Sequence, residues 1–432
     1  MAVSSHAKAK SHARHSSKDL TRRAARRSML AGFAVVLFLV SGVGIAWYDL
    51  QSQVNTIDIN KFLDDEHARQ VTDSYEGKPV NILILGTDSR AGANNVDGSE
   101  GSEEVAVARS DTAMVLHLPA DRSRIEIISI PRDLLVDIPS CKTADGGSTE
   151  AMSYTPFNAA FANGAGSRAD NTAVAAGVAC TIATVQDLTG LYMDEYLVVD
   201  FNGLTTTVDA LGGVNLYVDE DINDTEYTGL VMSKGCQHLD GPTALQYARV
   251  RHGVGDGSDL QRMPRQQNLV AAMLRTAKSK NYLTNADALY SFALAALKSL
   301  TTSEGIGNLT TLAGLVMSIG NVGADNMTLI TMPNEEAPWD RNRAIPTDES
   351  DDVWAAIKAD TPISEALQDA AAQEDADSTS SAPDSQDDTD EPQEQPTQSD
   401  SDDSATDNQS GTSNNKTPTA TATTQDPAAQ CR

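Results

Sequence analysis

The sequence predicts a layered α/β domain between two chain ends of different character. Strand-like apolar runs alternate with segments of helical length in the middle of the 432-residue chain, as in proteins whose sheet is covered by helices. An uncharged run near the N-terminus has the length of a membrane span, and the last part of the chain is acidic and poor in apolar residues. We therefore expect one transmembrane helix, then the folded domain, then a disordered tail.

The folded domain is expected to cover residues 79–333, with 334–360 as its C-terminal extension. The apolar run at 80–85 is typical of a buried strand that delivers a polar loop at its carboxyl end. Further strands are expected at 112–118, 124–130, 196–201, 214–218 and 327–332. Helices are expected at 171–188, 203–211, 242–248, 259–280, 285–299 and 306–319.

The N-terminal part predicts a membrane anchor. Residues 29–48 carry no charge, and their length matches the roughly 20 residues that one helix needs to cross a bilayer. Residues 1–28 are basic, which keeps the N-terminus in the cytoplasm. A cleaved signal peptide is the alternative, although its apolar core is usually only about 7 to 15 residues long. We expect a single-pass protein of the cell membrane, with 49–78 as a stalk and the rest extracytoplasmic.

The cysteines and the tail fit an extracytoplasmic setting. Four cysteines are too scattered for a metal site of closely spaced thiols, and disulfides form outside the cytoplasm. Cys141 with Cys180 is the preferred pair, but other connectivities and free thiols stay open, especially for Cys431. Residues 361–432 are rich in Asp, Ser, Gln, Thr and Pro, the composition of a disordered acidic tail.

Charge argues against nucleic acid and for an anionic ligand. The formal net charge is −29, whereas a duplex binder needs a basic footprint. Within this acidic chain, four arginines lie close together: Arg249, Arg251, Arg262 and Arg265. Arginine presents a planar fork of donors that matches phosphate oxygens, so the cluster predicts an anion site. The alternative is a solvated helix face on which these arginines neutralise carboxylates.

More charged residues flank the predicted strands. Ligands of α/β sheets bind outside the carboxyl ends of strands, so five of these charged residues could converge on one crevice. The five residues are Asp88, Arg90, Arg109, Asp111 and Arg132. Asp88 and Asp111 could hold Mg²⁺ (or Mn²⁺), which commonly takes one or two carboxylates together with phosphate oxygens. Each aspartate could instead be a turn or helix-cap residue.

Six motifs, in this order and spacing, resemble the LytR-CpsA-Psr family. They are Asn-Ile-Leu-Ile-Leu-Gly-Thr-Asp-Ser-Arg at 81–90, Arg-Ser-Asp-Thr at 109–112, Ser-Ile-Pro-Arg-Asp at 129–133, Asp-Phe-Asn-Gly at 200–203 with Asp-Ala-Leu-Gly-Gly-Val at 209–214, Leu-Asp-Gly at 239–241 with Tyr-Ala-Arg-Val-Arg at 247–251, and Arg-Gln-Gln at 265–267 after Arg262. One departure is Pro156, where the family usually carries a lysine. The resemblance implies a layered α-β-α catalytic domain with a central mixed sheet.

The resemblance also implies an activity. Family members transfer a glycopolymer from a polyprenyl-pyrophosphate carrier to a peptidoglycan sugar hydroxyl through a phosphodiester link. By motif position, Asp88 and Asp111 resemble the magnesium ligands, and either could instead act as the base for the hydroxyl. The residues that resemble pyrophosphate contacts are Arg109, Arg132, Arg249, Arg251, Arg262 and Gln266. Supporting candidates are Arg90, Asp259 and Arg265.

Two other functions remain open at the level of sequence. One is a hydrolase that uses water as the acceptor of the same pyrophosphate-linked lipid. The other is a non-catalytic regulator or scaffold of the cell envelope. The acidic charge of the chain argues against direct DNA binding by such a regulator.

Overall fold

The structure, a computed structural model, describes residues 26, 29, 33, 37–38, 41–67, 75, 77–87, 109–168, 170–254, 259–279, 286–323, 326–368 and 431. The chain divides into two compact units, Met1–Val54 and Asn55–Arg432. In the first unit the described residues are helical as far as residue 53. The predicted membrane span at 29–48 lies only partly within the described residues. The predicted tail lies almost entirely outside them.

Within the described part of the second unit, seven strands form one mixed sheet. In spatial order they are β1 (Asn55–Thr56), β12 (Leu300–Thr302), β7 (Glu195–Val199), β2 (Val80–Thr87), β3 (Ser110–Leu118), β4 (Ile125–Ile130) and β13 (Met327–Thr331). β2 pairs in parallel with β7 and antiparallel with β3, and β4 pairs antiparallel with β3 and in parallel with β13. The predicted fold class, an α/β domain with a central mixed sheet, is confirmed.

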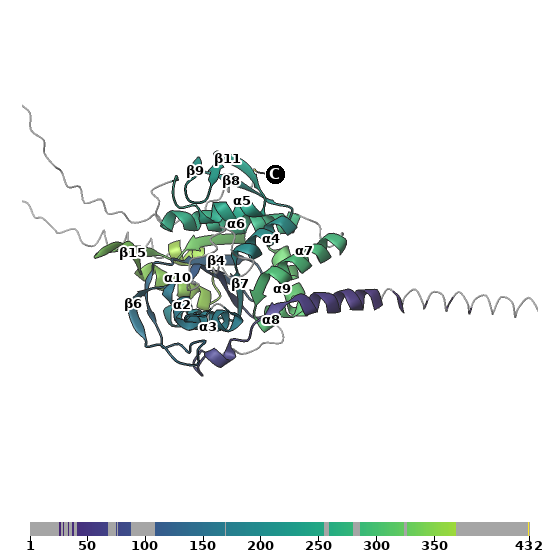
Figure 1. Ribbon diagram of the computed structural model, residues 1–432, viewed down its shortest axis with the longest axis horizontal. Helices are drawn as coiled ribbons and strands as arrows, with labels where there is room; N and C mark the ends of the chain where they lie inside the picture. The colour runs from purple at the N-terminus through teal and green to yellow at the C-terminus, as the bar shows by residue number, and fades with distance from the viewer. Residues whose placement is uncertain are drawn as a thin grey trace, which may run out of the picture. The chain divides into compact units, whose positions relative to one another are not determined.

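Helices cover both faces of this sheet. Leu83 and Leu85 of β2 belong to one apolar core, which is shared with α3 (Asn171–Thr189), whereas Ile82 belongs to the core on the other face. This alternation follows from the two-residue period of a strand. The first face also carries α2 (Ala159–Ala165) and α10 (Asp348–Lys358), and the second carries α6 (Asp259–Ser279), α8 (Glu304–Gly307) and α9 (Leu309–Asn321). Figure 1 shows α2 and α3 on one side of β4 and α6 on the other.

α3 is, among the described helices, the one that is long and apolar enough to cross a membrane. Its most apolar stretch is 72% buried, and it packs in the core of the domain. The helix begins after Asp170, whose side chain accepts hydrogen bonds from the backbone N–H groups of Thr172 and Ala173. It ends at Gly190, which takes the left-handed conformation that glycine adopts at low cost. Burial inside the domain accounts for the apolar composition of α3.

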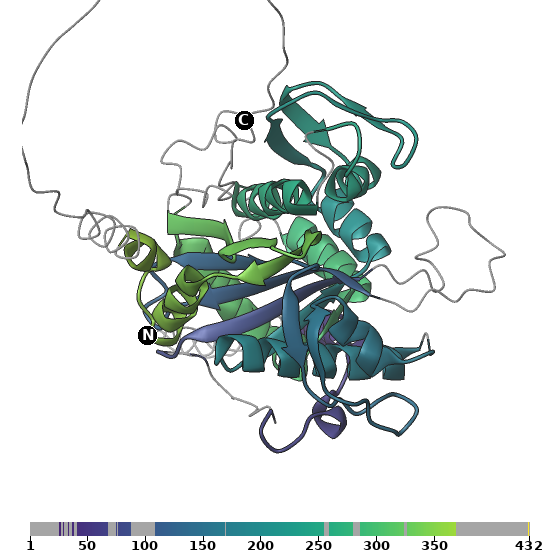
Figure 2. The same cartoon turned by 90° about the vertical axis from the view of Figure 1, so that its left-hand side faces the viewer.

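A second set of elements has its own apolar core. It contains α4 (Phe201–Ala210), α5 (Gly241–Arg249), β8 (Val214–Val218), β9 (Ile222–Asp224), β10 (Leu230–Met232) and β11 (Gly235–Leu239), with α7 (Ala286–Ser299) against α4. The predicted strand at 214–218 is present, but it pairs with β11 in a two-stranded sheet outside the central one. Figure 2 shows these hairpins beside α5 and α6, away from the central sheet.

Two disulfides tie distant parts of the chain together. Cys141 and Cys180, the pair preferred from the sequence, are bonded with their sulfur atoms 2.04 Å apart. Cys236 of β11 is bonded to Cys431, a pairing that the sequence left open. The first bridge joins the segment after β5 (Leu135–Ile138) to the middle of α3. Because Cys141 and Cys180 are both buried, this bridge lies inside the main core.

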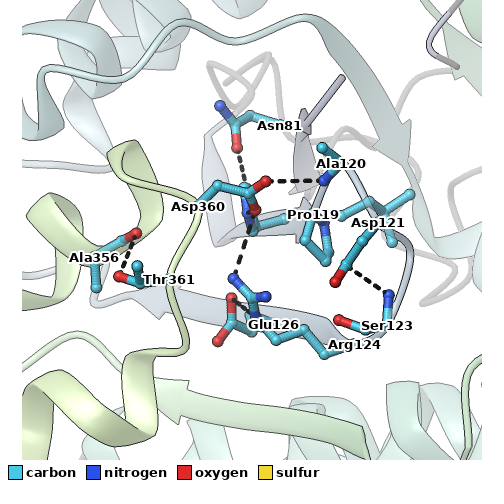
Figure 3. Close-up of polar contacts among 12 residues, drawn as sticks. Asn81, Pro119, Ala120, Asp121, Ser123, Arg124, Glu126, Ala356, Asp360 and Thr361 are labelled. Atoms are coloured by element: carbon cyan, nitrogen blue, oxygen red, sulfur yellow. Dashed lines mark hydrogen bonds and ion pairs between the residues drawn. The ribbon is translucent and has the colours of Figure 1, made fainter. Parts of the chain in front are cut away.

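The residues after β13 form part of the described domain. They form β14 (Asn334–Ala337), β15 (Asp340–Pro346) and α10, none of which we predicted. Asp360, with a left-handed φ of 58°, follows α10 and accepts a hydrogen bond from the backbone N–H of Ala120 at 3.0 Å. Its carboxylate also faces Arg124, as Figure 3 shows, and the ring of buried His117. This polar cluster fixes the end of α10 to the connection between β3 and β4.

Candidate functional site

The strand register brings one end of the sheet together. Thr87 at the end of β2 pairs with Ser110 at the start of β3, and Ile130 at the end of β4 pairs with Ala113 of β3. β7 and β13 run parallel to β2 and β4, so their carboxyl ends lie at the same end of the sheet. We call this region the carboxyl end of the sheet. It is the position at which α/β sheets bind ligands.

At the carboxyl end of the sheet, Arg132 and Asp111 form an ion pair. Nη1 of Arg132 donates to Oδ1 of Asp111 at 3.0 Å, and its Nε donates to Oδ2 of Asp133 at 3.2 Å. The Arg132 side chain is 18% exposed and that of Asp111 is 31% exposed, so the pair is partly accessible to solvent. Two carboxylates hold the guanidinium in one orientation, as is expected of a residue that must meet a charged ligand.

α6 adds a second arginine to the same point. Arg262, which is 5% exposed, donates from Nη2 to the backbone carbonyl of Asp111 at 2.8 Å. Gln266, one turn further along α6, accepts a hydrogen bond from Thr112 and donates to the carbonyl of Ala248 at 3.1 Å. The side chains of α6 therefore connect the start of β3 to the end of α5.

Arg249 is the last residue of α5 and lies near the carboxyl end of β7. Its guanidinium carbon is 4.7 Å from the centroid of the Phe201 ring, and Phe201 is the first residue of the helix that follows β7. An arginine over an aromatic face keeps its charge and gains a cation–π contact of roughly 0.5–1 kcal/mol when exposed. The structure thus brings Arg132, Arg262 and Arg249 to the carboxyl end of the sheet, near the end of β4, the start of β3 and the end of β7 respectively.

The other predicted arginines divide between interior and surface. Arg265 is 9% exposed and donates to the carbonyl of Val250 at 3.0 Å, so it supports the segment that carries Arg249 and Arg251. Arg251 is half-buried, in the segment that follows α5. Arg109 is exposed immediately before β3.

Three predicted site residues are not placed in full. Asp88 and Arg90 lie outside the described residues, although they follow the end of β2 directly. Asp259 is the first residue of α6, and its side chain is likewise not described. Within the described residues, no group of three or more His, Cys, Asp or Glu side chains could hold a metal ion.

Three residues of the site were missed from the sequence. Asp133 accepts from Arg132 and also from Nη1 of Arg343 at 2.7 Å. Asp133 belongs to the Ile-Pro-Arg-Asp motif, so its position was a usable signal. Arg343 belongs to β15, and no local pattern links it to a residue more than two hundred positions earlier. A third residue, Gln267, donates to Ser129 at 2.9 Å and pins α6 to the end of β4.

Known proteins resemble this chain in sequence. The cell wall biosynthesis protein LcpA of Corynebacterium glutamicum is 31% identical over 320 residues, which are 71% of this chain and 59% of LcpA. The polyisoprenyl-teichoic acid–peptidoglycan teichoic acid transferase TagV of Bacillus subtilis is 28% identical over 275 residues, which are 62% of this chain and 61% of TagV. The chain thus spans about three fifths of the length of these curated relatives.

A solved structure supports the fold. The crystal structure of protein gbs0355 from Streptococcus agalactiae matches with a TM-score of 0.50 and 21% identity over 66% of this chain and 88% of that chain. The model of the LytR_cpsA_psr family matches residues 46–359 of this chain, a range that includes the whole central sheet. Because this match covers most of the sequence, the chain belongs to the LytR_cpsA_psr family.

Proposed function

We propose that this protein transfers a glycopolymer from a polyprenyl-pyrophosphate carrier to a hydroxyl of peptidoglycan. The observation that carries the proposal is that Arg132 and Arg262 both donate hydrogen bonds to Asp111 at the carboxyl end of the sheet. Clustered arginines bind the pyrophosphate by paired, charge-assisted hydrogen bonds. The relatives support the choice of substrate, because TagV is a teichoic acid transferase to peptidoglycan and LcpA a cell wall biosynthesis protein.

The proposed reaction is a displacement at phosphorus. The acceptor hydroxyl oxygen forms a bond to the phosphorus next to the glycopolymer, and the bond from that phosphorus to the bridging oxygen breaks. Polyprenyl phosphate leaves as an anion, and the hydroxyl proton passes to a base, a role that Asp88 or Asp111 takes in place of holding a metal ion. Arg132 and Arg262 stabilise the negative charge that develops on the phosphate oxygens.

The residues present suit a Mg²⁺ ion that keeps several of its bound waters. Asp111 supplies one partly exposed carboxylate, and Asp88 is the second ligand that we propose. Mg²⁺ is usually held by one or two carboxylates with waters and phosphate oxygens, so a cage of three protein ligands is not required. When bound, the ion would neutralise phosphate charge and polarise the reacting phosphorus.

The proposal places this chemistry outside the cell. The uncharged segment at 29–48 anchors the protein in the membrane with its basic N-terminus in the cytoplasm. The domain then faces a lipid-linked substrate in the outer leaflet and peptidoglycan beyond it. Tag accessibility at the C-terminus of intact cells tests this topology, and an inaccessible C-terminus would contradict it.

The test is polymer transfer by the full-length protein in detergent or vesicles. Arg132→Ala is expected to lower the transfer rate by about a hundredfold or more, the usual cost of removing one donor to a transition-state oxyanion. The matched control is Arg168→Ala, since Arg168 is a 45% exposed arginine whose ion pair with Asp170 lies outside the site. Wild-type transfer by Arg132→Ala would refute the site. Release of free phosphorylated polymer at the same rate without acceptor would identify a hydrolase instead.

A further inference from the structure

A cavity beside the proposed site has no part in the chemistry described above. Its volume is about 480 Å³, within the range of roughly 300–1,000 Å³ typical of small-ligand pockets. It lies between the hairpins β5–β6 and β14–β15, where β6 is Met152–Pro156. Its lining consists of Leu135, Tyr154, Pro156, Trp339, Asp340 and Arg343.

Two aromatic side chains stand exposed at this cavity. Tyr154 is 71% exposed and Trp339 is 64% exposed, and their rings lie edge to face with centroids 6.3 Å apart. Tyr154 also has a positive φ of 51°, a conformation that is rare for a bulky residue, and its N–H donates to Asp137 at 3.3 Å. A strained backbone that presents a large ring to solvent is typical of a binding surface.

A chain of ion pairs joins the cavity to Arg132. Arg343 lines the cavity, and it shares Asp133 with Arg132 at N···O distances of 2.7 Å and 3.2 Å. The backbone N–H of Ala344 donates to the carbonyl of Asp133 at 3.2 Å, and Ala344 also forms an isolated bridge with Leu134. The cavity is therefore held in a fixed position relative to Arg132.

We propose that this cavity binds a sugar ring of the acceptor glycan, a neutral amino sugar of the peptidoglycan strand. The inference rests on the proposed function. One face of a pyranose is lined by C–H groups with partial positive charge, which suit the negative face of an aromatic ring. Its hydroxyl and acetamido groups suit the planar carboxylate and guanidinium of Asp340 and Arg343.

Charge distinguishes the acceptor from the donor. The arginine of the cavity is accompanied by Asp340, whose Oδ2 lies 3.9 Å from Nε of Arg343, and by Asp133. These carboxylates offset the positive charge of Arg343, so the cavity attracts a phosphate-bearing polymer only weakly. The binding of a neutral sugar does not depend on that charge. The glycan in the cavity would present a neighbouring hydroxyl to the phosphorus held at Arg132.

The experiment compares Trp339→Ala with Trp339→Phe in the full-length protein. Trp339→Ala is expected to raise the acceptor KM about tenfold, the loss expected when one stacked ring is removed, with kcat and the donor KM unchanged. Trp339→Phe keeps a ring and is expected to restore most of the acceptor affinity. The control is Tyr227→Ala, because Tyr227 is 63% exposed and its ring stacks on His252, far along the chain from the cavity.

A direct binding measurement separates this inference from the proposed function. Titration with tetra-N-acetylchitotetraose is expected to change the tryptophan fluorescence of the wild type and not that of Trp339→Ala. If the wild type binds this sugar but transfers no polymer, the proposed function fails and the cavity assignment stands. An unchanged acceptor KM in Trp339→Ala, or a raised donor KM, would overturn the cavity assignment while transfer itself continued.

Discussion

At the residue scale, neighbouring arginines of one helix have different roles. Arg262 and Arg265 are both buried, but Arg262 donates to the carbonyl of Asp111, whereas Arg265 donates to that of Val250. Residues three apart lie on the same side of a helix but about one turn apart along its axis, so each side chain reaches a different neighbour. Spacing in the sequence makes both arginines candidates for an anion site, and only their contacts show that Arg265 supports the chain next to Arg249.

His67 makes folding stability depend on pH. Burial disfavours the charged ring, but hydrogen bonds to Asp187 at 2.9 Å and Asp64 at 2.6 Å outweigh it, so the pKa of His67 is raised above 6.5. A raised folded-state pKa contributes stability that is fully present below the unfolded-state pKa. That stability is lost as the pH rises through the folded-state pKa.

His67→Gln is therefore expected to lower the free energy of unfolding more at about pH 5.5 than at about pH 8.5. Urea unfolding of both proteins at each pH measures the difference. His238→Gln, at an exposed histidine outside this cluster, is the control. Equal destabilisation by His67→Gln at both pH values would contradict the role of the two carboxylates.

At the element scale, close contact between α2 and α3 depends on glycine. A Cβ at Gly164 of α2 would lie 2.1 Å from the backbone carbonyl oxygen of Ala176 in α3, a distance that no relaxation of a side chain relieves. Gly177 of α3 is equally close to α2, since a Cβ there would lie 2.9 Å from the Phe161 ring. The two helices must approach this closely because both pack in the core beneath β3.

Gly164→Ala is expected to destabilise the protein by about 1–3 kcal/mol or more, the usual cost of overpacking a tight core. Gly314→Ala in α9 is the matched control, because nothing lies within 4 Å of a Cβ there and alanine favours a helix by roughly 0.5–1 kcal/mol. Chemical denaturation of both variants measures the effects. Equal changes in the free energy of unfolding for the two substitutions would contradict a tight contact between α2 and α3 at Gly164.

At the scale of the whole molecule, a disulfide joins the segment after β5 to the middle of α3 within the main core. Cys141 and Cys180 are 39 residues apart, and closing a loop of this length removes about 4 kcal/mol of chain entropy from the unfolded state. The double variant Cys141→Ala/Cys180→Ala is expected to lose stability on this order in urea unfolding. Unfolding midpoints equal to the wild type would show that the bridge contributes nothing to stability.

The sequence predicted the longer elements because their patterns are local. β2 and β4 are rich in apolar residues, and α3 begins after Asp170 and ends at Gly190, so none of these elements needs a distant partner to be recognised. β12 has only three residues and exists as a strand through its pairing with β7, which no local pattern specifies. The strand at 214–218 was recognised, but its place outside the central sheet is set by β11.

For the site, the sequence by itself determined which residues are available and the family to which the chain belongs. Arg132 and Asp111 flank predicted strands, and their proximity follows from the way strands pair. Tertiary structure alone decided that Arg343 shares Asp133 with Arg132, and that Tyr154 meets Trp339. The physical reason is that strand and helix patterns arise from neighbouring residues, whereas a contact between hairpins nearly two hundred residues apart depends on how the sheet and its covering elements pack.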